Sequence, residues 1–376
     1  MPTQCGDGKM AAKPRETQGM DYGILIPCLL LVGLGLVFIY SSSSFLAEHK
    51  LGDSYYFLKR QGVFCLVGLF LLIVARNIPS RFYARCAYPM LFVSLALLVS
   101  LLIPGVGKTV GGASRWLRFA GLSFQPSELA KLALAVYMAY SMAKKGQEMA
   151  SFSKGLLPHL LVGAVFMTLI VLQPDLGTAV IIGTWLMMIL FVGGVRTYQL
   201  AALVLAFAPA VGFLIWLEPY RLRRWWAFLE PWKDPHGLGF QIIHSFLAFG
   251  SGGLFGVGLG NSKQKLLYLP EPHTDFILSI IAEEVGLLGV ATVVMLFGFL
   301  VMRGIRAALN ARDLYSTYLA LGISAFLGLQ VLINMGVVMG LLPTKGLTLP
   351  LISYGGSSLV VNLLGIGILL SIARGS

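Results

Sequence analysis

Long runs of apolar residues, separated by polar connectors, cover almost the whole chain from Tyr22 onward. About ten of these runs are long enough to cross the hydrocarbon core of a bilayer as helices. Membrane β-barrel strands would instead alternate polar and apolar residues in short segments, which this chain does not do. The pattern therefore predicts an all-α, polytopic membrane protein. The predicted spans are 22–40, 57–75, 87–103, 126–143, 156–173, 176–193, 198–217, 276–301, 318–339 and 356–373.

The composition supports this prediction. Of the 376 residues, 57% are hydrophobic and 12% are charged, and the mean hydropathy is +0.82. These values exclude an ordinary soluble domain. We expect one membrane domain over residues 21–376, preceded by a cytoplasmic tail over residues 1–20. No small-residue cleavage signal follows the first span, so we expect the first helix to stay in the membrane.

Basic residues in the short connectors predict the orientation. Cytoplasmic connectors of membrane proteins carry an excess of Lys and Arg, and an even number of spans places both termini on one side. We therefore expect both termini in the cytoplasm, and a large extracytoplasmic loop at 218–275 between the seventh and eighth helices. The charged connectors carry Arg76, Arg81 and Arg85, Lys144, Lys145 and Lys154, Arg196, and Arg303, Arg306 and Arg312.

About half of the 28 basic residues nevertheless fall on the outer side. Long loops are translocated regardless of charge, which is one explanation. The other is an outer cavity that binds an anion such as a diphosphate. The net charge of +12 suits a protein beside anionic lipid, and no nucleic-acid-binding motif is present, so we expect no nucleic acid partner.

Cysteine and histidine patterns give no sign of a built-in metal site. The four cysteines form no CxxC pair and the five histidines form no HExxH motif. The second and third cysteines, Cys28 and Cys65, fall within predicted spans. Neither a disulfide framework nor a zinc site is expected.

Ionisable residues at membrane depth are costly and mark candidate functional sites. Pro126 suits the first turn of the fourth helix, and Glu128 and Lys131 then share one face, either as a neutralising pair or as substrate contacts. Arg115 and Trp116 precede them in a glycine-rich outer loop, where a Trp often serves only as an interfacial anchor.

A short turn, LQPDLG at 172–177, makes the fifth and sixth helices antiparallel neighbours and places Asp175 at its outer tip. An acid in a turn is usually a helix cap or part of the turn itself. A functional role for Asp175 is the alternative.

The stretch LPEPHTDFILSIIAEEVG, 269–286, leads from the long loop into the eighth helix. If that helix starts near Thr274, then Asp275, Ser279 and Glu283 form a polar stripe that faces away from lipid. Asp275 then lies near the helix N-terminus, which favours its ionised form. A helix cap is the simpler role for Asp275, and Glu283 with Glu284 could be buried structural acids that pair with arginines.

Two other segments belong to the same outer region. Glycines recur between residues 250 and 260, but no GK[ST] follows, so tight loops packed on the bundle are expected rather than a nucleotide site. The segment LPTKGLTLPLISYGGSS, 342–358, contains Lys345 and Ser353 and interrupts the helices. Non-helical backbone at membrane depth must be buried or line a cavity. Arg221, Arg223, Arg224, Lys263 and Lys265 either hold a diphosphate or form a solvated charge run.

Five motifs together, SRWL with FQPSELAK, QPDLGTA, GNSKQKLLYLPEPHTDFI, AEEVGLLG and PTKGLTLPLISYGGSS, closely resemble the SEDS family of bacterial cell-wall polymerases, the FtsW, RodA and SpoVE group. The resemblance runs from about residue 22 to residue 373 and keeps the family's order and spacing. GNSKQKLLYLPEPHTDF and PTKGLTLP look more like the division member, FtsW, than the elongation member, RodA.

The resemblance implies a ten-helix glycosyltransferase that polymerises lipid II into peptidoglycan glycan strands at the outer face of the bacterial cytoplasmic membrane, at the division septum. It implies Asp275 as the essential acid. A divalent cation, Mg²⁺ or Mn²⁺, and no organic cofactor are expected. The implied partners are a class B penicillin-binding protein transpeptidase and other divisome membrane proteins. The predicted substrate-binding residues are Arg115, Trp116, Glu128, Lys131, Asp175, Lys265, His273, Thr274, Glu283, Lys345 and Ser353.

Chemistry explains why one acid could suffice. A sugar linked through diphosphate already has a good leaving group, so the paired carboxylates of glycosidases are not required, but a base is. Two alternatives remain open from the sequence. A ten-helix bundle with polar interior residues also suits a lipid II flippase, and the chain could instead be a scaffold that recruits and activates a transpeptidase.

Overall fold

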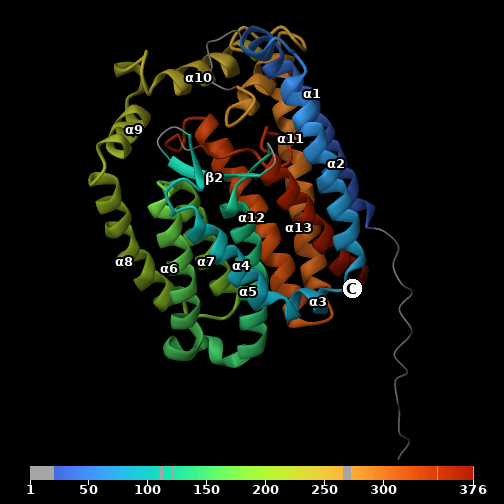
Figure 1. The fold of residues 1–376 in the computed structure, drawn as a ribbon, viewed down its shortest axis with the longest axis vertical. Coiled ribbons are helices and arrows are strands. Elements are labelled where there is room, and N and C mark those ends of the chain that lie inside the picture. The colour runs from blue at the N-terminus through green and yellow to red at the C-terminus, as the bar shows by residue number, and fades with distance from the viewer. Residues whose placement is uncertain (1–20, 111–112, 120–121, 266–271, 345, 376) are drawn as a thin grey trace, which may run out of the picture.

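A computed structural model of the chain describes residues 21–110, 113–119, 122–265, 272–344 and 346–375. Ten long helices form a bundle, and each coincides with a predicted span (Figure 1). The all-α prediction is therefore confirmed. These helices are α1 (Tyr22–Leu51), α2 (Tyr56–Asn77), α4 (Ala87–Ser100), α5 (Pro126–Lys145), α6 (Leu157–Leu172), α7 (Leu176–Val192), α8 (Thr197–Trp216), α11 (Ile277–Leu309), α12 (Leu314–Val338) and α13 (Gly356–Gly375).

Seven helices in the described residues are long and apolar enough to cross a membrane, and α4 and α7 are shorter apolar helices. The remaining long helix, α5, is more polar because it carries Glu128, Lys131, Lys144 and Lys145. Its first two charges, Glu128 and Lys131, pair with each other inside the bundle and therefore do not face lipid. The molecule is a multi-pass membrane protein.

The connectors contain elements that hydrophobic periodicity did not predict. The outer loop at 104–125 forms a small antiparallel sheet in the order β1-β2-β3, with Lys108 opposite Trp116. The large loop between α8 and α11 is partly helical rather than irregular. The added elements are α3 (Ser80–Arg85), β1 (Gly107–Val110), β2 (Ala113–Phe119), β3 (Leu122–Phe124), η1 (Gly146–Ala150), η2 (Phe152–Leu156), α9 (Pro219–Leu229), η3 (Pro231–Lys233) and α10 (Phe240–Gly252).

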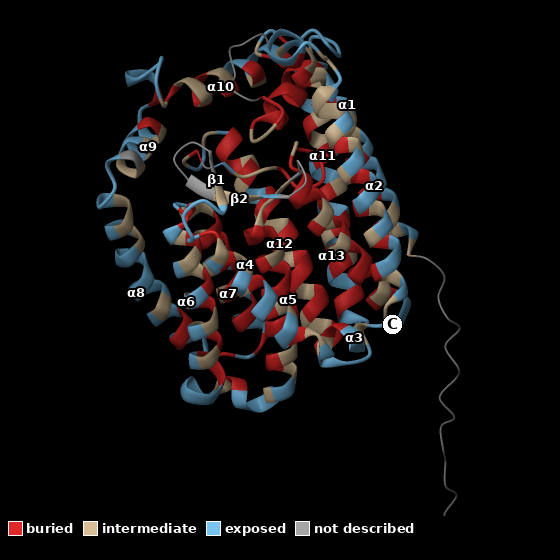
Figure 2. Ribbon diagram, in the orientation of Figure 1, coloured by how far each residue is buried: buried red, intermediate tan, exposed pale blue. Residues whose placement is uncertain are grey.

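Small residues and aromatic stacking hold the bundle together. A Cβ atom placed on Gly367 of α13 would lie 2.5 Å from the backbone oxygen of Leu72 in α2, so only glycine permits this close helix approach. Deeper in the core, the rings of Trp185 and Phe326 stack with centroids 4.0 Å apart. Figure 2 shows buried residues concentrated where α5, α12 and α13 meet.

The helix α8 is different from the others. Only 6% of its most apolar stretch is buried, and α8 stands at the edge of the bundle and continues into α9 and α10, which arch over one end (Figure 1). The start of α1 and the C-terminus lie together toward the other end. The arch, the sheet and the segment after α12 lie toward one end of the molecule, as expected for loops on the same side of a membrane.

Candidate active site

Asp275 lies where three segments meet. It is half-buried and lies two positions before Ile277, the first residue of α11. The side-chain amide of Asn334 in α12 donates to the backbone oxygen of Asp275 at 3.0 Å and to that of Leu347 at 2.7 Å. A Cβ atom on Gly346 would lie 3.4 Å from Oδ2 of Asp275, so the carboxylate lies against the backbone of the segment after α12. Helix α12 thus fixes the backbone of the candidate catalytic acid.

The helix itself begins at Ile277 rather than near Thr274, after Phe276, which has non-helical backbone angles and no side-chain cap. The expected polar stripe is nevertheless present. Ser279 and Glu283 are buried, and the hydroxyl of Ser279 lies 2.9 Å from that of Ser245 in α10. The stripe therefore faces α10 and the loop region, away from lipid.

His273 and Thr274 stand beside Asp275, and His273 is 3% exposed. The backbone oxygen of His273 accepts a hydrogen bond from the Tyr354 amide at 2.9 Å, and its ring packs 4.3 Å from that of Phe57. Burial, together with the charge of Lys50, lowers the pKa of His273 to about 4. The imidazole is therefore neutral at physiological pH.

The glycine-rich segment, residues 250–265, docks onto a break in α11 at Gly286, whose φ of 74° favours glycine. The Val257 amide donates to the backbone oxygen of Glu283 at 2.9 Å, and the Leu287 amide donates to the backbone oxygen of Gly253 at 2.9 Å. Backbone groups freed by the break are thereby satisfied. This geometry confirms that the glycines permit a tight loop on the bundle.

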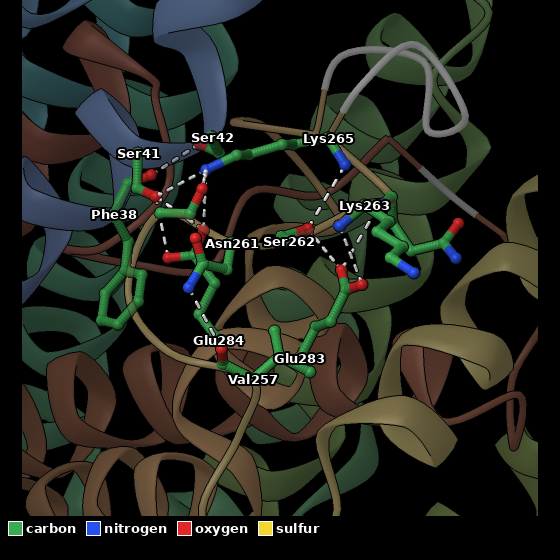
Figure 3. A network of polar contacts seen from close by, with 12 residues as sticks. Phe38, Ser41, Ser42, Val257, Asn261, Ser262, Lys263, Lys265, Glu283 and Glu284 are labelled. Atoms are coloured by element: carbon green, nitrogen blue, oxygen red, sulfur yellow. Dashed lines mark hydrogen bonds and ion pairs between the residues drawn. The ribbon is translucent and has the colours of Figure 1, made fainter.

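Two adjacent acids of α11 hold the end of this segment (Figure 3). The Glu283 carboxylate accepts hydrogen bonds from the Ser262 hydroxyl and from the backbone amides of Lys263, at 3.0 Å, and Gln264, at 3.3 Å. Glu283 is 2% exposed. Its carboxylate is occupied by protein donors, and a contact with substrate stays a prediction.

The second acid, Glu284, forms a buried ion pair with Lys265 at 3.0 Å. The same carboxylate accepts a hydrogen bond from the Ser41 hydroxyl of α1 at 2.7 Å, and the Lys265 ammonium also donates to the Gly260 oxygen at 2.6 Å. Both acids are buried and paired within the protein, as the structural alternative requires, but their donors are a lysine, hydroxyls and amides rather than the arginines that it named. A substrate contact by Lys265 stays a prediction.

Arg115 attaches the sheet to the turn between α6 and α7. Its Nε donates to the Gln173 oxygen at 3.3 Å, a second nitrogen donates to the Pro174 oxygen, and Nη1 lies 4.0 Å from the Asp175 carboxylate. Asp175 caps α7 through the Thr178 amide at 3.2 Å and hydroxyl at 2.8 Å. The cap interpretation is confirmed, and the neighbouring Trp116 is half-buried.

Glu128 and Lys131 form the predicted pair, 2.8 Å apart and almost fully buried. With Gln330 and Asn362 they line a cavity of about 40 Å³ between α5, α12 and α13, large enough for water but not for a sugar. Ser353 accepts a hydrogen bond from the Leu349 amide at 2.9 Å and shapes its own loop. Lys345 lies outside the described residues.

Asn334 is the site residue that the sequence analysis missed. Its signal was a lone amide within the apolar run VLINMGVV, which marks an intramembrane polar residue. Its Oδ1 atom is buried and has no hydrogen-bond partner among the described residues. Among the residues that the structure describes, no group of three or more His, Cys, Asp or Glu side chains is arranged to hold a metal ion.

Residues 22–376 match a family model described as cell cycle protein, the FtsW/RodA/SpoVE family. A probable peptidoglycan glycosyltransferase FtsW from Geobacter metallireducens is 48% identical over 359 residues, which cover 96% of both chains. The stage V sporulation protein E of Bacillus subtilis is 43% identical over 357 residues, which cover 94% of this chain and 97% of the relative.

Solved structures give the same relationship. One is a chain from a study of how a peptidoglycan synthase complex coordinates polymerization and crosslinking, with a TM-score of 0.78 and 33% identity over 95% of this chain and 98% of that chain. The other is the rod shape determining protein RodA of Thermus thermophilus, with a TM-score of 0.70 and 31% identity over 95% of this chain and 97% of that chain.

Proposed function

Because the chain belongs to the FtsW/RodA/SpoVE family, we propose that it is a peptidoglycan glycosyltransferase that polymerises lipid II into β-1,4-linked glycan strands for cell division. The observation that supports this most directly is the position of Asp275. Its half-buried carboxylate lies at the outer end of the bundle, against Gly346, with its backbone tied to α12. A carboxylate on a backbone held by α12, in a chain whose outer loops are rich in basic residues, suits attack on a diphosphate-linked sugar.

In the proposed reaction Asp275 accepts the proton of the 4-hydroxyl of the acceptor's N-acetylglucosamine. That oxygen attacks the anomeric carbon of the donor strand and forms the new glycosidic bond. The bond from the anomeric carbon to the polyprenyl diphosphate breaks, and the diphosphate leaves with the bonding electrons. Attack from the opposite face inverts the α linkage to β. His273 is neutral and buried beside the base, so it adds no positive charge there.

A divalent cation, Mg²⁺ or Mn²⁺, would neutralise the departing diphosphate. The described residues offer no cluster of three or more ligating side chains, which fits a cation held largely by phosphate oxygens and water, the usual state of Mg²⁺. Asp275 is the candidate protein ligand within the site. Basic residues of the loops predicted to be outer, such as Arg115 and, from its place in the sequence, Lys345, would attract the anionic substrate.

The membrane setting and partners follow from the same proposal. The protein lies in the bacterial cytoplasmic membrane at the division septum, with both termini in the cytoplasm. The start of α1 and the C-terminus lie on the same side of the molecule in Figure 1, which supports termini on one side of the membrane, and the basic connectors favour the cytoplasmic side. Likeness to a chain of a peptidoglycan synthase complex supports pairing with a class B penicillin-binding protein transpeptidase.

A lipid II flippase is the second candidate, because a ten-helix bundle also suits a lipid path. A flippase needs polar residues through the full depth of the bundle. Here the buried polar contacts around Asp275, Arg115 and Lys265 gather toward the outer end, which favours chemistry at that face.

The test is lipid II polymerisation by the wild type and by Asp275→Asn, each reconstituted with its cognate transpeptidase and Mg²⁺ or Mn²⁺. Asparagine keeps the size of the side chain and removes the base. Glycan strands from the wild type and none from a folded, partner-binding variant are expected. Equal strand synthesis by both proteins would refute the role of Asp275.

A further inference from the structure

The end of the bundle opposite Asp275 contains a separate cavity. It lies where α2 ends and α3 begins, and its volume is about 380 Å³, in the range of ligand pockets. Three side chains supply N–H donors and three supply apolar surface, and none of these lining residues is acidic. The lining consists of Asn77, Ile78, Pro79, Arg81, Phe82 and Arg85.

The two arginines of this cavity are positioned to share one anion. Arg81 and Arg85 are exposed and four positions apart on α3, so they share one helix face, where like charges disfavour each other. Within the described ranges neither guanidinium makes an ion pair or hydrogen bond with the protein. By contrast, Arg303 pairs with Asp21 at 2.7 Å. An anion between Arg81 and Arg85 would remove the repulsion between the two guanidinium groups and accept bidentate hydrogen bonds from them.

The cavity is fixed to the bundle. The hydroxyl of Ser371 in α13 donates to the Ile78 oxygen at 2.6 Å, and the hydroxyl of Ser316 in α12 donates to that of Ser80 at 2.9 Å. The segment that carries the arginines is therefore held from two neighbouring helices, which preorganises it for a ligand.

An apolar stripe on α2 leads from the lipid-facing surface to the cavity. Leu66, Phe70 and Ile73 follow one another at helical spacing and are 71%, 65% and 55% exposed. The next residue of the stripe, Asn77, bonds back to the Ile73 oxygen at 3.0 Å and lines the cavity. Because α2 crosses the membrane, this stripe contacts lipid chains, and a molecule whose head occupies the cavity can place its chain along it.

We propose that the cavity binds the phosphodiester headgroup of an anionic phospholipid, with an acyl chain along the α2 stripe. The two arginines match the charge and the paired oxygens of the phosphodiester, and basic pockets on the cytoplasmic side of membrane proteins bind lipid headgroups. A soluble anion would use the arginines but would gain nothing from the apolar surface of α2 beside them. The site is distinct from the proposed catalytic site at the other end of the bundle and does not depend on it.

The test is lipid retention measured by native mass spectrometry of the detergent-purified protein, offered equal amounts of phosphatidylglycerol and phosphatidylcholine with identical chains. The wild type is expected to retain phosphatidylglycerol preferentially, and Arg81→Gln/Arg85→Gln to lose that preference by roughly tenfold. Lys144→Gln, an exposed lysine of α5 outside the cavity, is the matched control and should behave as the wild type. Equal retention of both lipids by the wild type, or an unchanged preference in the double variant, would overturn the proposal.

Two further experiments use the wild type alone, so they do not depend on whether a variant folds. The first distinguishes a lipid headgroup from a free phosphate, and the second locates the bound lipid. Inorganic phosphate should not displace the lipid, and displacement by it would replace the lipid assignment with a simple anion site. A photoactivatable phosphatidylglycerol should crosslink the wild type within residues 66–85, and crosslinks confined to other segments would refute the site.

Discussion

The ammonium of Lys265 lies 3.0 Å from the carboxylate of Glu284, and both side chains are buried where α1, α11 and the glycine-rich segment meet. The Ser41 hydroxyl completes the junction from α1 (Figure 3). Desolvating two charges is costly, and the pair is maintained only because each partner compensates the other. This relationship gives Lys265 a structural partner that competes with any role in binding substrate.

Removing one member of this pair is expected to be more harmful than removing both. Lys265→Met or Glu284→Gln leaves a buried group without its partner and should cost about 3–5 kcal/mol of stability. The double variant Lys265→Met/Glu284→Gln should recover part of this loss, and its KM for lipid II should stay near that of the wild type. Thermal unfolding and polymerisation kinetics measure both quantities.

Lys263→Met is the matched control, since this neighbouring lysine contributes only its backbone amide to Glu283 and its side chain is exposed. A large rise in the KM for lipid II in the folded double variant Lys265→Met/Glu284→Gln would instead show that Lys265 contacts the substrate. Strictly additive losses of stability in the double-mutant cycle would contradict the coupling.

The helices could be predicted because hydrophobic runs are local, and a helix satisfies its own backbone within lipid. The sheet could not, because the pairing of β2 with β1 and β3 joins short strands and leaves no hydrophobic period that a sequence pattern detects. The break at Gly286 is also hidden in the sequence. It lies between the apolar residues Val285 and Leu287, and only the docking of Gly253 and Val257 explains it.

The acidic residues of the site could be predicted because a charged side chain at membrane depth is energetically costly and stands out in an apolar sequence. Their hydrogen-bond and ion-pair partners could not be predicted. Glu284 pairs with a lysine 19 residues earlier and with Ser41, 243 residues away. Such contacts depend on how α1 packs on α11, which no local pattern encodes. For the same reason Asn334, 59 residues from Asp275, was missed although its type and position marked it as costly.

Asn334 is expected to act as a positioning residue for Asp275. In Asn334→Leu, which keeps the approximate volume, the backbone oxygens of Asp275 and Leu347 lose their donor, at about 1–3 kcal/mol for each unsatisfied group. The candidate base would then be poorly fixed, so kcat should fall by roughly tenfold or more with KM little changed. Steady-state polymerisation kinetics test this, and thermal unfolding shows whether the variant is folded.

Asn310→Leu, a substitution of an exposed asparagine at the other end of α11, serves as the control and should keep its kcat. If Asn334→Leu raised KM and left kcat intact, the asparagine would bind substrate rather than position the base.

His273 is expected to make stability depend on pH in a defined window. Its pKa is about 4 in the folded protein against an ordinary value of 6.5. Between these values the unfolded chain binds more protons than the folded one, so stability is full above about pH 6.5 and falls as the pH drops toward 4. The loss should reach about 3 kcal/mol.

His273→Phe removes the titrating group and keeps an aromatic ring against Phe57 and Tyr354. Unfolding of the detergent-solubilised protein, followed at intervals from pH 7.5 to 4.5, should show a smaller acid-induced decrease in the variant than in the wild type. Because the two proteins share every other titrating group, the difference between their pH curves isolates this histidine. Parallel curves would mean that the pKa of His273 is the same in the folded and unfolded protein, so burial would not hold the imidazole neutral. The folded protein would then have to accommodate a charged ring two residues from Asp275.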